Sequence, residues 1–362
     1  MAEATAADGV SKLEQLRSYL PQRGRVFIIP HDHPDPDALA SAAAMERLLA
    51  GAFGLRGQIV FSGMVSRAEN RELLRQLRYR WKPLSQVREP RKPVPCIFVD
   101  TSPWSGNVTV PAYGVPVAVI DHHPVTRSSK PKGLYKDIRS GTGASATILT
   151  EYLQSAGLTV PKWLATIMAF AITTETQDLS RATSDEDLEA YMYLLRLSNL
   201  NALGRIRHAA LPRDYYGRLG EAMANARTYG RVGWTHLQSV KNPEIVAELA
   251  DLLLRMERIT WSFATAQMGD RLLLSLRSSQ PSARCGRLVR KIMGRKGGGG
   301  GHHRMAAGYL NLGSLEDEAV ARQRQALIHA MVSAIEPRLS LPSGALEEQA
   351  QKLVESGTGV IS

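Results

Sequence analysis

The sequence has few cysteines and no apolar run long enough to cross a membrane. Its two cysteines, Cys96 and Cys285, lie far apart and cannot form a disulfide framework or a four-thiolate zinc site. The longest apolar stretches, such as residues 164–172, fall well short of the ~20 residues that a membrane span needs. The first residues contain Glu3 and Asp8, where a secretory signal would be basic and then apolar. We therefore expect a soluble cytoplasmic protein with no membrane partner.

Acidic residues are also scarce relative to basic ones. The chain has 45 lysines and arginines against 34 aspartates and glutamates, which gives a net charge of +11. The basic excess is clearest in residues 67–82 and 284–296. The first run is as typical of a solvated helix face as of a binding surface. The second adjoins a segment of glycines and histidines, which favours a partner that carries phosphate.

The length of 362 residues and a hydrophobic content of 44% predict a folded chain of about two domains. The hydrophobic patterns predict an α/β protein in which a larger parallel-sheet domain precedes a smaller α/β domain. We expect the first domain at residues 1–200, a helical linker at 201–231, the second domain at 232–340 and a peripheral tail at 341–362.

Three continuous apolar runs predict the buried strands of the parallel sheet. They occupy residues 25–30, 95–99 and 115–120, and helical patterns at 38–49 and 69–77 separate the first from the second. Further helices are expected at residues 13–20, 143–156, 163–172 and 184–197, the last with Ser184 and Asp187 as its N-terminal cap. In the second domain we expect strands at residues 233–240, 261–269 and 270–279 and a helix at 242–256.

Histidines and aspartates follow each of the three apolar runs. The first leads into His31, the second into Asp100, and the third into Asp121, His122 and His123. The carboxyl ends of neighbouring strands in an open α/β sheet line one crevice, so we expect these side chains to converge there.

The stretch "HDHPDPD", residues 31–37, crowds two histidines and three aspartates into seven positions. The helix that follows would stabilise one or two of these carboxylates at its N-terminus, but this does not account for the histidines. A pair of hard divalent cations accounts for the whole group, because carboxylate and imidazole together suit Mn²⁺ or Mg²⁺. A metallo-β-lactamase-like site is disfavoured, since Asp37 stands where that family has a histidine.

The motif "VAVIDHHP", residues 117–124, indicates which class of metal-binding protein this is. Together with the spacing of His31, Asp35 and Asp37 and with Asp100 between them, it resembles the DHH phosphoesterase superfamily. "ITTETQD", residues 172–178, is similar to the fourth motif of that family.

Within this fourth motif the sequence departs from the family pattern. Glu175 occupies the usual aspartate position; it is still an oxygen ligand but one methylene longer, and Asp178 is the alternative.

The segment "GGGGGHHRMAAG", residues 297–308, resembles the signature of the DHHA1 substrate domain. His303 aligns with the family histidine, Arg277 in "LRSS" is similar to the arginine of the family, and His302 replaces a glycine. Five glycines alone are typical of a flexible linker, but they also let backbone amides approach a phosphate closely. A Walker loop is excluded, because neither Lys-Ser nor Lys-Thr follows the glycines.

The resemblance implies two divalent metal ions, Mn²⁺ in the first place, with Mg²⁺ or Co²⁺ as alternatives. It implies Asp100 as a bridge between both ions, Asp121 as the group that orients a ligand imidazole, and His123 as a contact to the scissile phosphate. The first ion would be held by His31, Asp35 and Asp100, and the second by Asp37, Asp100, His122 and Glu175. A terminal phosphate would be held by Arg277, Gly300, Gly301, His303 and Arg304.

Within this superfamily the chain resembles the compact bacterial nanoRNases. The resemblance implies a Mn-dependent phosphodiesterase or exonuclease that hydrolyses very short single-stranded RNA or linear dinucleotides to mononucleotides. The alternative is a small-nucleotide phosphatase that acts on 3'-phosphoadenosine 5'-phosphate. A further alternative, from another class, is a nucleic-acid-binding module without catalysis. The sequence leaves the oligomeric state, the substrate length and the direction of attack open.

Overall fold

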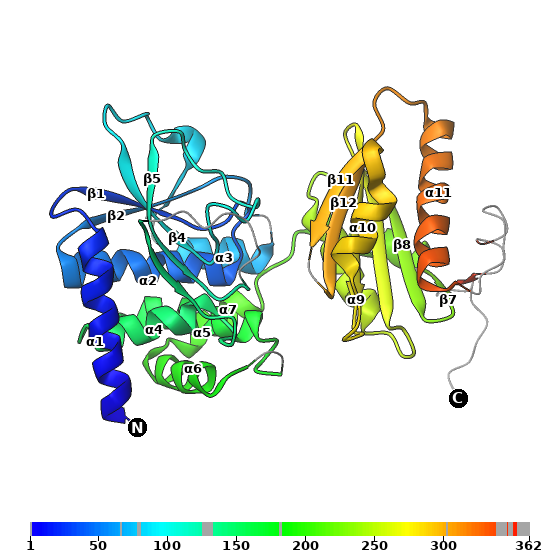
Figure 1. The fold of residues 1–362 in the computed structure, drawn as a ribbon. Coiled ribbons are helices and arrows are strands. Elements are labelled where there is room, and N and C mark those ends of the chain that lie inside the picture. The colour runs from blue at the N-terminus through cyan, green and yellow to red at the C-terminus, as the bar shows by residue number, and fades with distance from the viewer. Residues whose placement is uncertain are drawn as a thin grey trace. The chain divides into compact units, whose positions relative to one another are not determined.

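The computed structural model describes residues 2–65, 67–77, 81–124, 133–180, 183–301, 303–337, 346 and 350–352. The chain divides into two compact units, Met1–Ala210 and Leu211–Ser362, each with its own sheet (Figure 1). The expected tail at 341–362 lies almost wholly outside the described residues. Within it, β13 (Gln351–Lys352) pairs antiparallel with β7 (Arg227–Tyr229).

The first unit contains a six-stranded parallel sheet in the order β3-β2-β1-β4-β5-β6. The strands are β1 (Arg25–Ile29), β2 (Arg56–Phe61), β3 (Trp81–Pro83), β4 (Val94–Val99), β5 (Gly114–Asp121) and β6 (Tyr135–Ile138). The three strands expected from apolar runs are confirmed as β1, β4 and β5. The others were not predicted, because β2 opens with Arg56, Gly57 and Gln58 and β3 has only three residues.

The strand order creates a topological switch point between β1 and β4. From β1 the chain proceeds to β2 and β3 on one side, and then returns to β4 and continues to β5 and β6 on the other. Ligand sites in open α/β sheets lie where the order reverses, outside the carboxyl ends of the strands. His31 and Asp100, which follow β1 and β4, therefore meet at this point.

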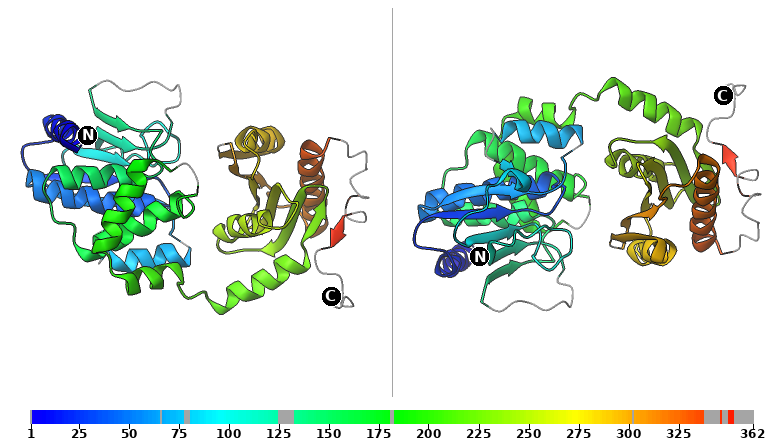
Figure 2. Two further views of the ribbon diagram at one scale, coloured as in Figure 1. Left: turned by 90° about the horizontal axis from the view of Figure 1, so that it is seen from below. Right: turned by 90° about the horizontal axis from the view of Figure 1, so that it is seen from above.

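Helices cover one face of this sheet. They are α1 (Ala2–Tyr19), α2 (Pro36–Phe53), α3 (Ala68–Gln76), α4 (Ser145–Ser155), α5 (Lys162–Glu175), α6 (Asp185–Leu197) and α7 (Leu200–Arg207); a short 3₁₀ turn, η1, spans Leu84–Gln86. In the left view of Figure 2, α2, α4 and α5 lie in front of the sheet. A smaller core on the opposite face includes Phe27, Phe98 and Val119, with the partly buried Trp104 and Tyr113 packed against it.

Helix α2 begins and ends where its sequence dictates. The Asp35 carboxylate accepts a hydrogen bond from the Ala38 N–H, Pro36 occupies the first turn, and Gly54 closes the helix in the left-handed region at φ 64°. The alanines between them give a narrow helix that is buried from Pro36 to Met45 and packs against α4 and α5. The same N-terminus carries Asp35 and Asp37 at the switch point.

The second unit contains a mixed seven-stranded sheet in the order β11-β12-β10-β9-β8-β7-β13. Its further strands are β8 (Val232–Ser239), β9 (Trp261–Met268), β10 (Arg271–Ser278), β11 (Gly297–Gly301) and β12 (Met305–Asn311). Its helices are α8 (Arg213–Ala224), α9 (Glu244–Leu254), α10 (Cys285–Met293) and α11 (Asp317–Ile335), with a 3₁₀ turn η2 at Gly294–Lys296. The predicted strands and the predicted helix of this domain are confirmed.

The connecting segment differs from the single helical linker expected at residues 201–231. It contains two helices, since α7 ends at Arg207 and α8 begins after Pro212. Proline lacks an N–H and fixes φ, so it starts a helix and cannot continue one. Helix α7 packs on α5 in the first unit, and α8 packs on β8 in the second.

The five consecutive glycines form the edge strand β11, which pairs antiparallel with β12. Close packing explains the residue type. A Cβ on Gly297 would lie 1.8 Å from the Tyr309 carbonyl oxygen, and one on Gly299 would lie 2.6 Å from Val289 of α10. A Cβ on Gly300 would meet open space. The segment is therefore a packed strand with one open position and not a flexible linker.

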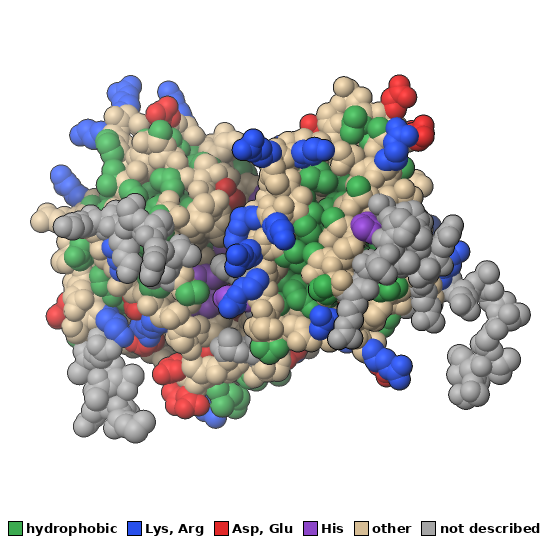
Figure 3. Space-filling view, turned by 45° about the vertical axis from the view of Figure 1, so that its right-hand side comes forward, with side chains coloured by type: hydrophobic (Ala, Val, Ile, Leu, Met, Phe, Trp, Pro, Cys, Tyr) green, Lys and Arg blue, Asp and Glu red, His purple; other side chains and the backbone are tan. Residues whose placement is uncertain are grey.

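Basic side chains are prominent on the surface, and Figure 3 shows more blue Lys and Arg side chains than red Asp and Glu side chains on the face it presents. The basic run at 284–296 forms the exposed face of α10 and the turn that follows, while Val289 and Met293 of the same helix are buried. In the part of the chain that the structure describes, this exposed face has no carboxylate within ion-pair distance.

Among the described residues, we find no helix that combines the length and the apolar character needed to cross a membrane.

The Asp187 carboxylate is the main polar support of the first unit. It is fully buried and accepts hydrogen bonds from the Gly143 N–H (2.7 Å), the Thr147 hydroxyl (2.6 Å) and the Ser184 N–H (2.8 Å). Ser184 and Asp187 form the predicted cap of α6 as a reciprocal capping box. The carboxylate thus ties the start of α6 to the loop that leads into α4.

We predict that Asp187→Ala lowers the free energy of unfolding by about 2 to 4 kcal/mol, because it leaves buried donors without an acceptor. The matched control is Asp185→Ala, which removes an exposed carboxylate in the first turn of the same helix and is expected to cost at most about 1 kcal/mol. Urea unfolding followed by circular dichroism measures both. Equal losses in the two variants would contradict a supporting role for Asp187.

Candidate metal centre

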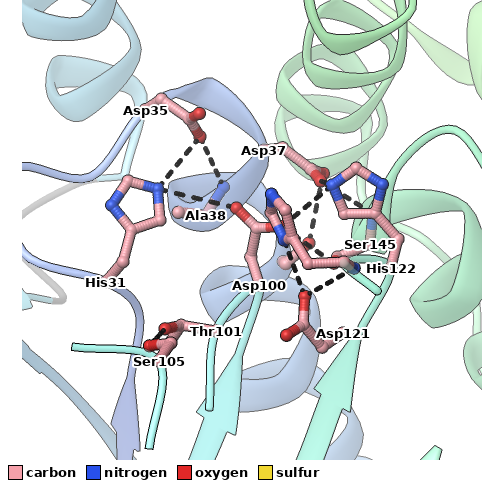
Figure 4. Close-up of polar contacts among 12 residues, drawn as sticks. His31, Asp35, Asp37, Ala38, Asp100, Thr101, Ser105, Asp121, His122 and Ser145 are labelled. Carbon is pink, nitrogen blue, oxygen red and sulfur yellow. Dashed lines mark hydrogen bonds and ion pairs between the residues drawn. The ribbon is translucent and has the colours of Figure 1, made fainter. Parts of the chain in front are cut away.

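The predicted acids and histidines of the first unit converge at the switch point. His31, Asp35 and Asp37 come from the end of β1 and the start of α2, Asp100 follows β4, and the Asp-His-His triplet closes β5 (Figure 4). Segments that lie far apart in the chain supply one cluster of side chains, as the strand ends predicted.

The Asp100 carboxylate lies at the centre of this cluster. One oxygen, Oδ2, lies 3.6 Å from His31 Nε2, which is itself 3.7 Å from Asp35 Oδ1. The other oxygen, Oδ1, lies 3.4 Å from His122 Nε2 and 3.7 Å from His123 Nδ1. Two groups of potential metal ligands therefore share Asp100: His31 and Asp35 on one side, His122 and His123 on the other.

Asp100 has an unusual backbone conformation. Its φ is 58°, in the left-handed region, and its N–H donates to the Ile120 carbonyl of β5. Aspartate enters this region more readily than most residues, at a modest energetic cost. The side chain is 2% exposed, so the turn presents a carboxylate into a buried position between β1 and β5.

The N-terminus of α4 binds the Asp37 carboxylate. Asp37 accepts hydrogen bonds from the Ser145 N–H (2.7 Å) and the Ala146 N–H (2.8 Å), and the Ser145 hydroxyl donates to Asp100 Oδ1 at 3.0 Å. The helix dipole and these donors stabilise two negative charges that would otherwise repel each other. Sequence reasoning missed Ser145. Its only signal was the small-residue segment "GTGAS" before a helix.

Mutual repulsion and burial shift the pKa values of the side chains in this cluster. Burial and the charges of Asp37, Asp35 and Asp121 raise the pKa of Asp100 well above its ordinary value. Burial alone would lower the pKa of His31, but the interaction with Asp35 outweighs it and raises the pKa to about 9. The cluster thus favours a positive charge near Asp35 and Asp100.

The donor set fits divalent cations. His122 Nδ1 lies 3.3 Å from the Thr142 carbonyl oxygen, which places the proton on Nδ1 and leaves a lone pair on Nε2. That Nε2 atom is buried without a hydrogen-bond partner and faces Asp100 Oδ1 and Asp37 Oδ2, the latter at 3.9 Å. A lone pair that faces two carboxylates is unfavourable unless a cation lies among them. Separations of 3.4 to 3.9 Å between donors also suit ligands of a common cation, each bound at ~2.0 to 2.2 Å.

Asp121 holds His123. Its Oδ1 atom accepts hydrogen bonds from His123 Nδ1 (2.8 Å) and from the His123 N–H (3.0 Å). The imidazole that Asp121 orients is therefore that of His123, while a backbone carbonyl orients His122. Burial lowers the pKa of His123, but Asp121 more than compensates and raises it above its ordinary value.

The fourth motif contributes Glu175 and Asp178 in different environments. Glu175 ends α5 and is partly buried, and its charge raises the pKa values of Asp100 and His123. The Asp178 side chain is 84% exposed and lies 3.6 Å from Arg207. Residues 177–179 all have φ between 49° and 63°, a tight turn that directs Asp178 outward. The position of Glu175 as a ligand stays a prediction, and the electrostatics favour it over Asp178.

The predicted phosphate contacts lie in the second unit around β10, β11 and the turn before β12. His303 is exposed, its Nδ1 atom is paired with the Arg284 guanidinium, and Arg304 is partly buried. Arg277 is buried, and its Nε atom donates to Asp251 while Nη1 donates to Ser275. Gly300 and Gly301 end the glycine strand. His302 lies outside the described residues.

Comparison with known proteins agrees with this architecture. The DHH family N-terminal domain matches residues 25–172, and the DHHA1 domain matches residues 230–331. Together the matches cover more than half of the chain, which belongs to the DHH family and carries a DHHA1 domain.

Curated relatives and a solved structure give the same result at lower similarity. The chain is 28% identical to an uncharacterized protein of Methanocaldococcus jannaschii over 331 residues, 91% of this chain and 66% of that protein. It is 26% identical over 167 residues to a probable manganese-dependent inorganic pyrophosphatase of Streptococcus pyogenes, 44% of this chain and 51% of the pyrophosphatase. The chain thus spans about two thirds of the first relative and about half of the second. An exopolyphosphatase-related protein from Bacteroides fragilis shares the fold, with a TM-score of 0.64 at 14% identity, covering 90% of this chain and 96% of that one.

We predict that Asp100→Asn abolishes high-affinity Mn²⁺ binding, because the substitution removes the charged group that both ligand sets share. In the absence of metal the same variant is expected to melt a few degrees higher than the wild type, because it relieves repulsion among buried carboxylates. Calorimetric titration with Mn²⁺ and thermal unfolding in a chelator measure the two effects.

The matched control is Asp32→Asn. The Asp32 carboxylate lies in the same loop but accepts hydrogen bonds from Thr109, and it belongs to neither ligand group. Its affinity for Mn²⁺ should stay within about twofold of the wild type. Unchanged Mn²⁺ binding in Asp100→Asn would contradict a shared ligand at this position.

Proposed function

We propose that the protein is a Mn-dependent phosphodiesterase that hydrolyses very short single-stranded RNA or linear dinucleotides to mononucleotides. The observation that supports this most strongly is the buried Asp100 carboxylate shared by two ligand groups at the switch point. A carboxylate shared by two ligand groups would hold two cations close together, as two-ion phosphoryl hydrolysis requires. The manganese named for the pyrophosphatase relative favours Mn²⁺ over Mg²⁺ or Co²⁺.

We propose that His31, Asp35 and Asp100 hold one cation and that Asp37, Asp100, His122 and Glu175 hold the other. The chemistry that such cations supply when bound is activation of a water and neutralisation of the charge that builds on phosphoryl oxygens. Ser145 and the α4 N-terminus fix Asp37 and Asp100 before any ligand arrives. The site is therefore preorganised, which reduces the cost of assembling the ligands.

His123 is the proposed contact to the scissile phosphate. The hydrogen bond from its Nδ1 to Asp121 fixes the orientation of the ring that would contact a substrate oxygen. The raised pKa of His123 keeps the ring protonated at higher pH than usual, so it can neutralise the phosphate or donate a proton to the leaving oxygen. Asp121 is then a positioning residue that acts through this imidazole.

The second unit is proposed to bind the terminal phosphate of the substrate. His303, Arg304 and the open position at Gly300 combine an exposed imidazole, a guanidinium and a strand edge that a ligand can approach. Among the described residues, Nη2 of Arg277 has no hydrogen-bond partner, which leaves it for a phosphate oxygen. The basic face of α10 would attract such anions. We also place the enzyme in the cytoplasm, where its two buried thiols would stay reduced.

We predict that purified protein with Mn²⁺ converts labelled RNAs of two to five nucleotides to mononucleotides much faster than RNAs of twenty. Asp100→Ala should lower the rate by at least about a thousandfold with the fold intact, and Asp32→Asn should retain most of it. A parallel reaction contains 3'-phosphoadenosine 5'-phosphate. Phosphate release from that nucleotide with RNA untouched would replace the proposal by the phosphatase. Inactivity on both substrates despite Mn²⁺ binding would overturn the enzymatic proposal and leave the nucleic-acid-binding module.

We predict that Gly300→Ala and His303→Ala each raise KM for a dinucleotide about tenfold while kcat changes little, because both alter ground-state binding at a distance from the reacting atoms. Gly300→Ala is a clean probe, since the added methyl group meets no atom of the described residues within 4 Å. The control is Gly217→Ala on α8, where a methyl group also meets open space. A wild-type KM in Gly300→Ala would remove the β11 edge from the binding site.

A further inference from the structure

The second unit contains a cavity that the proposed function does not use. It has a volume of about 210 Å³ and is lined by the end of α8, by β7 and β8 and by one side of α11. Its lining residues are Asn225, Arg227, Trp234, His236, Gln238, Arg324 and Ile328. The glycine strand β11 and β8 are at well-separated positions in the sheet order, with β12, β10 and β9 between them. The cavity is therefore distinct from the proposed phosphate contacts at Gly300 and His303.

The charge of this cavity is unbalanced. Arg227 and Arg324 both line it, and no carboxylate is among the described residues of its lining. In the part of the chain that the structure describes, neither guanidinium has an acidic side chain within 4.0 Å; Arg227 donates to the carbonyls of Ala224 and Ala226 instead. Two partly buried cations without a counter-ion are unfavourable, and a bound anion would remove this cost.

His236 fixes one of the two guanidinium groups without neutralising it. Arg324 Nη1 donates to His236 Nε2 at 2.9 Å, and the opposite nitrogen, Nδ1, contacts the Thr265 hydroxyl at 3.0 Å. Burial and the charge of Arg324 lower the pKa of His236 to about 4, so the ring is neutral at pH 7. A neutral acceptor orients the guanidinium yet leaves its full charge for a ligand. A carboxylate in the same position would have cancelled that charge.

The walls of the cavity restrict the size and chemistry of the ligand. Trp234 and Ile328 supply an apolar wall, and Asn225 and Gln238 supply amide groups. The volume lies below the ~300 to 1,000 Å³ of usual small-molecule pockets, so the ligand must be small. Two arginines match a dianion better than a singly charged carboxylate, and a phosphate carries about −1.5 to −2 at pH 7.

We propose that this cavity is a second anion site of the protein, which binds a phosphate dianion either as free phosphate or as a small phosphomonoester. Arg227 and Arg324 bind the phosphate oxygens, and His236 is the positioning residue that holds Arg324. The inference stands on the contacts within the second unit alone and does not depend on the proposed hydrolytic function.

The test is a titration of the full-length protein in a chelator, with inorganic phosphate in one arm and ribose 5-phosphate in the other. We expect saturable binding with a Kd of about 1 mM or tighter for at least one ligand. Arg324→Gln and Arg227→Gln should each raise that Kd at least about tenfold. The indole N–H signal of Trp234, assigned with Trp234→Phe, should shift during the titration because the ring lines the cavity. A preference between the arms identifies the ligand as free phosphate or as a phosphomonoester.

Arg322→Gln is the matched control, since Arg322 lies on the same helix but is 68% exposed and pairs with Glu318. It should bind as the wild type does. Arg324→Lys keeps the charge but loses the planar fork of the guanidinium, so it should bind with intermediate affinity. This variant shows whether lost binding in Arg324→Gln results from the missing charge or from misfolding. Retained binding in both Arg227→Gln and Arg324→Gln would overturn the proposal, as would failure of either ligand to saturate the protein. His303→Ala should leave this binding intact, and Asp100→Ala should too. Loss of hydrolysis in those variants would therefore concern the proposed function alone.

Discussion

The first unit depends on the concentration of negative charge at the switch point of its sheet. Asp37 and Asp100 are almost completely buried, and Asp35 and Asp121 raise the pKa of Asp100 further. Burying a charge is costly unless it is paired, and burying neighbouring like charges is more costly still. Such a cluster persists only if the surrounding structure supplies donors and if a positive charge can occupy its centre. The features around it meet both conditions.

Backbone donors supply the first part of this compensation. The N-terminus of α2 is capped by Asp35, and the N-terminus of α4 donates two amides to Asp37. The position of α4 depends in turn on Asp187, whose carboxylate binds the loop before α4 and the start of α6. These helices are thus oriented so that their positive ends face the acids, and α6 holds this orientation through a fully buried side chain.

Bound cations would supply the second part of this compensation, and the histidines indicate where they would bind. His31 and His122 each direct Nε2 toward an oxygen of Asp100, on opposite sides of the same carboxylate. His123, by contrast, has its Nδ1 atom engaged with Asp121. The difference in hydrogen bonding separates imidazoles that suit metal ligation from an imidazole that suits contact with substrate. This separation is the physical basis for assigning different roles to adjacent residues of one motif.

Much of this arrangement could be predicted from the sequence, because it depends on local patterns. Apolar runs that end in His31, Asp100 and Asp121 define both the strands and the edge at which they end. The role of Ser145 could not be predicted, since its amide binds an aspartate 108 residues away. Pro212 alone indicates that a helix ends before it and a new one begins after it. We predicted a single helical linker because the polar, arginine-bearing pattern continues across this proline. The strand formed by five glycines required knowledge of how closely β12 and α10 approach.

The second unit shows why charge composition alone cannot locate a binding site. A basic surface such as the exposed face of α10 attracts anions at long range but does not select among them. Arg324 differs because a partly buried, neutral histidine, 88 positions away in the chain, fixes its guanidinium in a cavity that a second arginine also lines. No sequence spacing links these residues, and the pairing of β7 with β8 and the packing of α11 against the same core bring them together. Selectivity requires such fixed geometry, because a preorganised guanidinium loses less freedom when it binds an anion than a solvated one does.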